Sequence, residues 1–301
     1  MLAVLLLALG GLPVCTPAPS PAVGSWSQSE RLANPRDDFG LVVLSGKLWA
    51  LGGMSGSRGN VLGSVESFEP SVGRWSPGPA MPTPRSSAGV AALDGLIYVV
   101  GGLAEGGEVS AAVEAFDARS GLWTRRAPLP TPRMQLAAVP VDGTIWAIGG
   151  NTGGPAIGAV EVYDPTTDRW SASESLPTPR YGLAAAVFED KVFVVGGQTP
   201  RGPLPTVEVA TPGRARWEPG PPLPEGLSRL GLAVLGRNLH ALEGSSHFRL
   251  GSGARAWDAA PPSPTPRHGL SAAALGDRLF AVGGCSADWI DVPVNEVYRA
   301  G

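Results

Sequence analysis

An arginine and a glutamate recur along the 301-residue chain at a nearly constant spacing and could do chemistry together. The arginine follows a proline, and the glutamate comes 28 to 30 residues later in an apolar run. The five pairs are Arg36 with Glu66, Arg85 with Glu114, Arg133 with Glu161, Arg180 with Glu208, and Arg267 with Glu296. A guanidinium beside a carboxylate could bind an anion or assist proton transfer. Because the pair recurs in nearly every unit of the sequence, we expect a structural role, in which the two groups satisfy each other or backbone groups between units.

Polar residues that differ from one unit to the next are better candidates for recognition. One set directly follows each Pro-Arg position, and a second set follows a glycine pair that ends an apolar run. The candidates are Asp37, Asp38, Ser87, Gln135, Tyr181, Arg229 and His268 in the first set, and Asn151 and Gln198 in the second. Side chains that vary on a constant frame are typical of a binding surface.

The sequence contains no pattern typical of a metal site, a cofactor site or a nucleic-acid-binding surface. The three histidines lie at distant phases of the repeat, without the spacing of a metal site, and we expect neither a metal nor a cofactor. His240 occupies a strand position that other units fill with an aromatic residue, so a core role is expected for it. The net charge is −3 and no basic cluster is long enough to follow a phosphate backbone, which argues against a nucleic-acid partner.

Six tryptophans mark the elements that must position these residues. Each lies nine residues before the Pro-Arg position and 26 residues before the end of the apolar run: Trp26, Trp75, Trp123, Trp170, Trp217 and Trp257. In the fifth unit, Gly226-Leu227 replaces Pro-Arg and Glu243-Gly244 replaces the glycine pair. A spacing repeated in this way indicates one supersecondary unit stacked against copies of itself, and therefore a single domain over residues 23–301.

Each unit contains the signals of four strands. A run of small apolar residues, a turn such as Asp94-Gly95 and a second apolar run predict a hairpin. The glutamate lies on a third strand, and the tryptophan lies on a short fourth strand. We therefore predict an all-β fold, a six-bladed β-propeller of four-stranded antiparallel blades. The strand around Trp26 should close the ring as the outermost strand of the sixth blade, because no tryptophan strand follows Tyr298.

The glycine pair after a strand, the Val-Glu-x-Phe/Tyr run and the tryptophan, repeated every 47 to 49 residues in the first units, resemble the kelch motif. The resemblance covers residues 23–301. It implies a protein-binding platform, because kelch propellers mostly act in that way. It also implies that six of the candidates ring a central pocket, namely Asp38, Ser87, Gln135, Tyr181, Arg229 and His268. The family also includes an exported bacterial sialic acid mutarotase.

Two further features concern the same face of the expected disc. Arg229 belongs to the unit that lost its Pro-Arg and several loop residues, and a lone arginine facing a channel suits a carboxylate, with Asp37 and Asp38 on another blade supplying the opposite charge. Structural decay of a degenerate blade explains the same departures. Trp289 lies in the loop after the sixth glycine pair and is a candidate contact anchor.

The N-terminal segment differs in kind from the repeats. Residues 1–22 contain no charged side chain, and their apolar run, Leu2–Leu12, has the length of a signal-peptide core but is too short to span a bilayer as a helix. We expect a signal peptide, export and no membrane span. Lipid attachment at Cys15 is less expected, because Val14 is not the small residue that such sites favour.

These features together predict an exported, monomeric kelch propeller that binds a protein or a glycan through one face and has no catalytic residues. The alternative is a sugar isomerase similar to the sialic acid mutarotase, acting through Arg229 with Asp38 or His268. Short loops argue against that alternative, because mutarotase members of the family carry long insertions. A purely structural repeat within a larger assembly is a third hypothesis.

Overall fold

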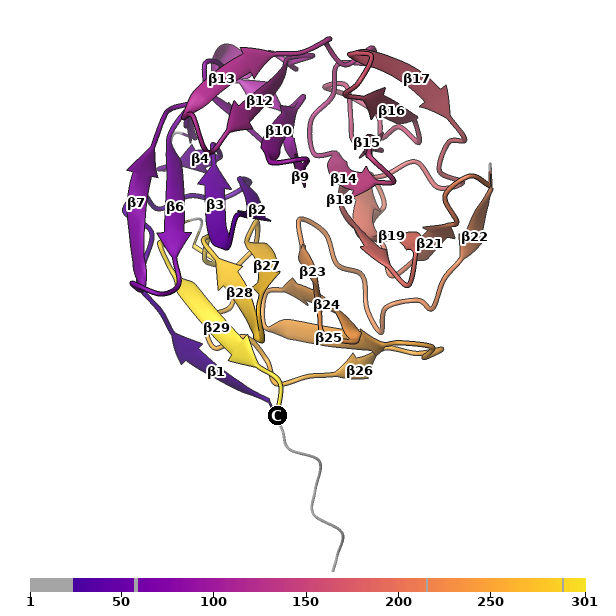
Figure 1. Cartoon of the computed structure of the whole chain (residues 1–301). Coiled ribbons are helices and arrows are strands. Elements are labelled where there is room, and N and C mark those ends of the chain that lie inside the picture. The colour runs from indigo at the N-terminus through magenta and orange to yellow at the C-terminus, as the bar shows by residue number, and fades with distance from the viewer. Residues whose placement is uncertain (1–23, 57–58, 215, 289) are drawn as a thin grey trace, which may run out of the picture.

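Six antiparallel sheets stand around a central axis as the blades of a propeller (Figure 1). The computed structural model describes residues 24–56, 59–214, 216–288 and 290–301. Each sheet is a four-stranded meander, and the sheet of the fourth blade adds a short fifth strand. Within the described residues the one helical element is a 3-10 turn, Glu105–Gly107. The all-β, six-bladed prediction is confirmed, whereas the expected signal peptide and Cys15 lie outside the described residues.

The strands of each blade follow one another outward from the central axis. Blade 1 contains β2 (Gly40–Leu44), β3 (Lys47–Leu51), β6 (Val65–Glu69) and β7 (Arg74–Gly78). Blade 2 contains β9 (Gly89–Leu93), β10 (Leu96–Val100), β12 (Val113–Asp117) and β13 (Leu122–Arg125). Blade 3 contains β14 (Ala137–Val141), β15 (Thr144–Ile148), β16 (Val160–Asp164) and β17 (Arg169–Ser173).

The second half of the chain continues the series. Blade 4 contains β18 (Tyr181–Phe188), β19 (Lys191–Thr199), β21 (Val207–Ala210) and β22 (Trp217–Pro219), with β20 (Gly202–Pro203) beside β19. Blade 5 contains β23 (Gly231–Leu235), β24 (Asn238–Glu243), β25 (Ser246–Gly251) and β26 (Asp258–Ala259). Blade 6 contains β27 (Ser271–Leu275), β28 (Arg278–Val282), β29 (Asn295–Arg299) and β1 (Ser25–Gln28). Outside the blades, β4 (Met54–Ser55) pairs with β5 (Asn60–Val61), and β8 (Arg85–Ser86) pairs with β11 (Leu103–Ala104).

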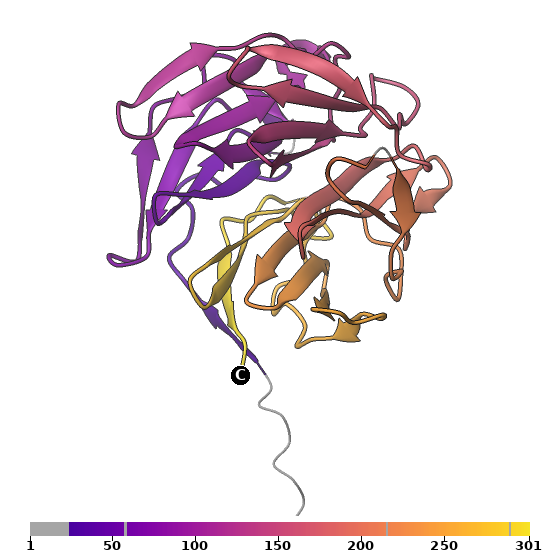
Figure 2. The same ribbon diagram turned by 45° about the vertical axis from the view of Figure 1, so that its right-hand side comes forward.

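The N-terminal strand closes the ring, as the sequence predicts. Strand β1 pairs antiparallel with β29, with Trp26 opposite Tyr298, and the two strands lie side by side near the C-terminus (Figures 1 and 2). The Trp26 and Tyr298 rings are in contact, with centroids 5.3 Å apart. Closure of this kind joins the two ends of the chain in one sheet and covers the edge of β29.

The six repeated tryptophans hydrogen-bond to the linkers that lead into the blades. Every indole N–H donates to a linker carbonyl at 2.8 to 3.1 Å: Trp26 to Pro261, Trp75 to Glu30, Trp123 to Pro79, Trp170 to Ala127, Trp217 to Glu174 and Trp257 to Pro221. This bond requires an indole at a fixed place on the outermost strand, which explains why the tryptophan recurs.

The repeated arginines and glutamates form buried ion pairs. Each Pro-Arg arginine has a fully buried side chain, and its guanidinium lies 2.6 to 3.0 Å from the glutamate of the same blade. In blade 1, Arg36 Nη1 also donates to the carbonyls of Gly52 and Ser64, at 2.9 and 3.0 Å. The pair therefore satisfies backbone groups where the second strand ends and the third begins. The pairs lie within a blade and not between blades.

The glycine pairs allow each blade to meet the next. In blade 1, Gly52 and Gly53 have φ values of 62° and 97°, and the Gly53 N–H donates to the Arg85 carbonyl of blade 2 at 3.0 Å. A Cβ atom at Gly52 would collide with the same carbonyl oxygen. Glycine is therefore required both for the left-handed backbone and for the close approach.

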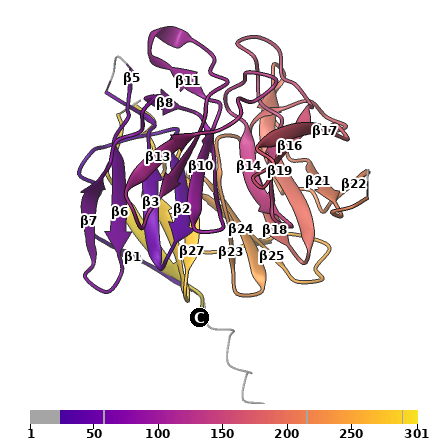
Figure 3. The ribbon, with the colours of Figure 1, turned by 45° about the horizontal axis from the view of Figure 1, so that its top comes forward.

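The hydrophobic core lies between neighbouring blades. One cluster, for example, joins Ala91 and Tyr98 of blade 2 to Ile145 and Tyr163 of blade 3. The loops after the glycine pairs and the residues after each Pro-Arg position lie on one face, which we call the loop face, and the turns of the inner hairpins lie on the other, the hairpin face (Figure 3). Small and apolar side chains of the innermost strands line a cavity on the central axis, which we call the channel.

Candidate functional site

The second residue after each Pro-Arg position lines the mouth of the channel on the loop face. These six residues are Asp38, Ser87, Gln135, Gly182, Arg229 and Gly269. All have a positive φ, between 48° and 62°. Five backbone hydrogen bonds of 2.7 to 3.1 Å run from the N–H of one member to the carbonyl of the preceding one: Ser87 to Asp38, Gln135 to Ser87, Gly182 to Gln135, Arg229 to Gly182, and Asp38 to Gly269. The blades thus hold these residues in one ring.

The backbone of this ring is strained at four of its six positions. A left-handed conformation costs a non-glycine residue about 1–2 kcal/mol, and Asp38, Ser87, Gln135 and Arg229 all adopt it. The hydrogen bonds between blades hold the residues there. Hairpin-turn residues such as Asp94 and Asp142 adopt the same conformation, but in the ring it occurs in residues of four blades that surround one pocket.

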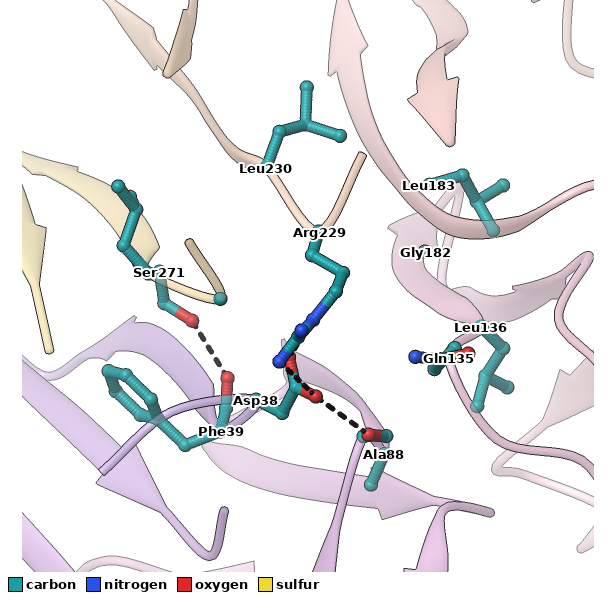
Figure 4. Close-up of a pocket in the computed structure, with 13 residues that line it drawn as sticks. Asp38, Phe39, Ala88, Gln135, Leu136, Gly182, Leu183, Arg229, Leu230 and Ser271 are labelled. Atoms are coloured by element: carbon teal, nitrogen blue, oxygen red, sulfur yellow. Dashed lines mark hydrogen bonds and ion pairs between the residues drawn. The ribbon is translucent and has the colours of Figure 1, made fainter. Parts of the chain in front are cut away.

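A pocket of about 460 Å³, including the space open to solvent, lies inside the ring. Its polar side chains come from the ring and from Ser271, and its apolar wall comes from the next residue of each blade: Phe39, Ala88, Leu136, Leu183, Leu230 and Leu270. Figure 4 shows the Arg229 side chain reaching across the mouth to Asp38, with Gln135 on the neighbouring wall. The pocket is therefore polar at its rim and apolar on its walls, which is typical of a ligand site.

Arg229 connects blade 5 to blade 1 across blade 6. Its Nε donates to Asp38 Oδ1 at 2.8 Å, and its Nη2 lies 2.7 Å from Asp38 Oδ2 and 3.0 Å from Asp37 Oδ2. Blade 6 makes room with Gly269, where a Cβ atom would lie 3.1 Å from Nη2 and 3.0 Å from Asp38 Oδ1. Burial lowers the pKa of Arg229, but the two carboxylates raise it above its ordinary value. Asp37 and Asp38 thus supply the opposite charge, as expected from the sequence, but Arg229 is not free to bind the carboxylate of a ligand.

Asp37 is the unusual acid of this cluster. It is 5% exposed, and its Oδ1 atom has no hydrogen-bond partner among the described residues. Burial and the neighbouring Asp38 carboxylate raise the pKa of Asp37 to about 6, although Arg229 opposes the shift. Burial, together with Asp37, also raises the pKa of the nearby Cys285 thiol to about 12. The carboxyl of Asp37 therefore changes protonation close to neutral pH.

Four of the six residues expected in the pocket line it, and the other two do not. Tyr181 and His268 do not line the pocket; the glycines that follow them do, because the ring takes the second residue after each Pro-Arg position. The first residue instead pairs with the residue after the glycine pair: Asp37 with Met54, Met134 with Asn151, Tyr181 with Gln198, and His268 with Cys285.

Asn151 and Gln198 consequently lie outside the ring. The Asn151 side chain supports it, since Asn151 Nδ2 donates to Gln135 Oε1 at 2.9 Å. Trp289 lies outside the described residues. One signal in the sequence could have shown which residue after Pro-Arg faces the pocket. Glycine occupies the second position at Gly182 and Gly269, and glycine is typical of a position with a positive φ.

Sequence reasoning missed Glu243 as a partner of these residues. Glu243 replaces the first glycine of a pair, accepts a hydrogen bond of 2.7 Å from the Ser228 N–H, and lies 3.4 Å from Nδ1 of the half-exposed His268. Burial raises the pKa of Glu243. The departure of blade 5 from the repeat thus adds another carboxylate beside the mouth.

Metal-binding clusters and membrane-spanning helices are both absent from the described residues. These residues contain no group of three or more His, Cys, Asp or Glu side chains placed to hold a metal ion. Nor do they include a helix that is long and apolar enough to cross a membrane.

Comparison with known proteins agrees with this architecture. No curated protein matches the chain. Among solved structures 895 chains match, so the fold by itself does not single out a function. One of them, described as "Structure of YjhT", is 16% identical with a TM-score of 0.77, and the match covers 88% of this chain and 95% of that one. A family model, the KLHDC2/KLHL20/DRC7 Kelch-repeats domain, matches residues 22–218, which is more than half of the chain. The protein belongs to this kelch-repeat family.

Proposed function

We propose that the protein is a binding module that recognises a protein or a glycan through the loop face, with one group of the ligand in the mouth of the channel. The observation that carries the proposal is the ring in which Asp38, Ser87, Gln135 and Arg229 occupy equivalent, strained backbone positions. Different polar side chains on one rigid frame are what recognition requires. Membership of the kelch family supports the same function.

The charges around the mouth favour a neutral or basic group. Arg229 is the one basic side chain of the ring, and it is paired with Asp37 and Asp38. Glu243 lies close by, and Asp291 is near enough to raise the pKa of Asp37. An anion would have to displace a carboxylate from Arg229 and then face the remaining acids. A hydroxyl, an amide or a basic side chain meets no such cost.

A sugar isomerase is the second candidate, and one observation favours it. Asp37 has a pKa raised to about 6, which suits a carboxyl that accepts and returns a proton near neutral pH. The pairing of Arg229 weighs against an acidic sugar, because the guanidinium is already occupied. Exchange between the anomers of neutral and acidic sugars, followed by NMR with wild type and Asp37→Asn, tests this candidate. Exchange that is accelerated by wild type and not by Asp37→Asn would establish it.

The binding function is tested first by thermal unfolding in the presence of ligand classes. Basic, neutral and acidic peptides and neutral and acidic glycans form the panel. A ligand at 100 times its dissociation constant stabilises the folded state by about 2.7 kcal/mol, which raises the unfolding temperature by several degrees. We expect the rise with basic or neutral ligands. A rise with acidic ligands alone would contradict the charge argument, and no rise with any class would contradict the binding function.

Export and a monomeric state complete the proposal. Both rest on the sequence, the first on the uncharged apolar segment 1–22. Expression of the full chain in a host with its envelope fractions separated tests export, and light scattering of the purified protein tests the monomer.

A further inference from the structure

A second cavity, distinct from the channel mouth, lies at the outer rim of blade 4. It has a volume of about 810 Å³, including the space open to solvent. Its walls are largely apolar and include Trp217, Pro177, Pro219 and Pro222. Its polar lining includes Glu208, the glutamate of the repeated ion pair.

The carboxylate of Glu208 differs from its four counterparts in other blades. In blades 2, 3 and 6 a threonine hydroxyl donates to one oxygen and the arginine donates to the other, as Thr131 at 2.7 Å and Arg133 at 3.0 Å do for Glu161. In blade 1 the backbone N–H of Ala33 binds the second oxygen of Glu66 at 2.8 Å.

Glu208 receives no such second hydrogen bond, although Thr178 stands at the position of Thr131 and lines the cavity. Its Oε1 lies 3.0 Å from Arg180 Nη2, whereas its buried Oε2 has no hydrogen-bond partner among the described residues. Glu208 is only 6% exposed, and it lies in the wall of the cavity. Burying a carboxylate oxygen without a hydrogen-bond donor costs free energy. A ligand that supplies the donor recovers that free energy as binding affinity.

The charges of the cavity select the sign of that ligand. Among the described residues, the cavity lining contains two carboxylates, Glu208 and Glu218, and no basic side chain. The nearby Arg180 is already engaged by Glu208 and by the carbonyls of Gly196 and Thr206. The site therefore carries a net negative charge, which favours a cation. Its proline and tryptophan surfaces suit the methylene groups of an aliphatic chain.

We propose that this cavity binds a primary ammonium group on an aliphatic chain, with the ammonium donating to Glu208 Oε2 and the chain lying against Trp217 and the prolines. A free alkylamine and the lysine side chain of a partner share this chemistry. The site is independent of the channel mouth, so its test does not depend on the function proposed for the loop face.

The experiment titrates the full-length protein with n-butylammonium chloride and follows the indole N–H resonance of Trp217 by NMR. We expect a saturable shift, and no comparable shift with n-butanol, which has the same chain without the charge. Loss of the charge-assisted hydrogen bond in Glu208→Gln should weaken binding about tenfold or more. Glu161→Gln, the same change in blade 3, is the matched control and should leave the affinity unchanged.

A second variant keeps the test decisive if Glu208→Gln fails to fold. Thr206 is exposed and lines the cavity, so Thr206→Lys places a tethered ammonium at the site and should abolish the response to butylammonium. Nα-acetyl-lysine methylamide distinguishes the sources: tighter binding than butylammonium indicates a partner's lysine, and weaker binding indicates a free amine. An equal response to n-butanol, no response of Trp217, or unchanged binding in Thr206→Lys would overturn the proposal.

Discussion

Two buried histidines at the seam between blades 5 and 6 should make the closure of the ring sensitive to acid. His247 Nδ1 donates to the Pro261 carbonyl at 2.8 Å, so its Nε2 must accept from His240 Nδ1, 2.9 Å away. That arrangement leaves His240 Nε2 as an unprotonated acceptor, and it has no partner among the described residues. Both rings contact Tyr298 of the closing sheet, with centroids 5.7 and 4.9 Å away. The pair is thus built for two neutral imidazoles.

The magnitude follows from the two pKa values. Burial lowers the pKa of His240 to about 3 and that of His247 to about 4, with Arg249 adding to both shifts. In the unfolded chain each histidine takes up its proton near pH 6.5. Between pH 6.5 and 4.5 the unfolded state therefore binds two protons that the folded state does not, and the free energy of unfolding falls by about 1.4 kcal/mol per pH unit for each histidine. From pH 7.5 to 4.5 the two together cost on the order of 5 kcal/mol.

The repeat itself provides the control. Other blades carry an aromatic residue at the position of His240, and the first four blades carry valine at the position of His247, so His240→Phe with His247→Val restores the pattern of the repeat. Urea unfolding of both proteins at pH 7.5 and 4.5 measures the effect. We expect wild type to lose several kcal/mol more of its free energy of unfolding than the double variant on acidification. Equal losses, within about 1 kcal/mol, would refute this expectation.

Three further changes have defined outcomes. Trp26→Ala removes the indole that binds Pro261 and packs on Tyr298, and it should lower the free energy of unfolding by about 3 kcal/mol in urea; an effect below 1 kcal/mol would mean that the closing strand contributes little. Gly269→Ala adds a Cβ about 3 Å from both partners of the Arg229 ion pair, so it should cost about 1–3 kcal/mol in thermal unfolding and more than Gly182→Ala, which shares the positive φ but meets Arg229 at 3.4 Å. Cys285, buried and with its pKa raised to about 12, should react with iodoacetamide at pH 8 at least about tenfold more slowly than a free thiol; a normal rate would show that the cluster around Asp37 opens readily.

The fold could be predicted because its determinants are local and repeated. Trp26 keeps its spacing to Pro35 although it precedes the first full unit, and that single fact predicts the pairing of β1 with β29. The structural role of Arg36 and Glu66 follows from their recurrence. What the sequence does not reveal is that such a pair lies within one blade, since that depends on how the linker folds back over its own sheet.

The candidate site could be predicted only in part, because it depends on backbone phase and on contacts between distant residues. The resemblance to kelch propellers assigns Asp38 and Arg229 to the mouth correctly, but it implies Tyr181 and His268 where the structure has the glycines that follow them. Polarity does not reveal which residue has a positive φ. Asp37 and Asp38 are expected from the sequence to supply the opposite charge to Arg229, but the sequence does not show that both carboxylates bind the guanidinium across nearly 200 positions of the chain. This pairing favours a neutral or basic ligand, whereas an unpaired arginine suggests an acidic one.

Two matched variants of blade 2 test most directly whether the mouth on the loop face is the binding site. Ser87 and Asp94 lie at opposite ends of β9, both have a positive φ, of 54° and 49°, and only Ser87 lines the mouth. The measurement is the affinity of each variant, Ser87→Tyr and Asp94→Tyr, for the ligand that stabilises the wild-type protein. We expect at least a tenfold loss of affinity for Ser87→Tyr, a cost of about 1.4 kcal/mol or more, and no change for Asp94→Tyr. Unchanged binding by Ser87→Tyr, or an equal loss in both variants, would contradict binding at the mouth.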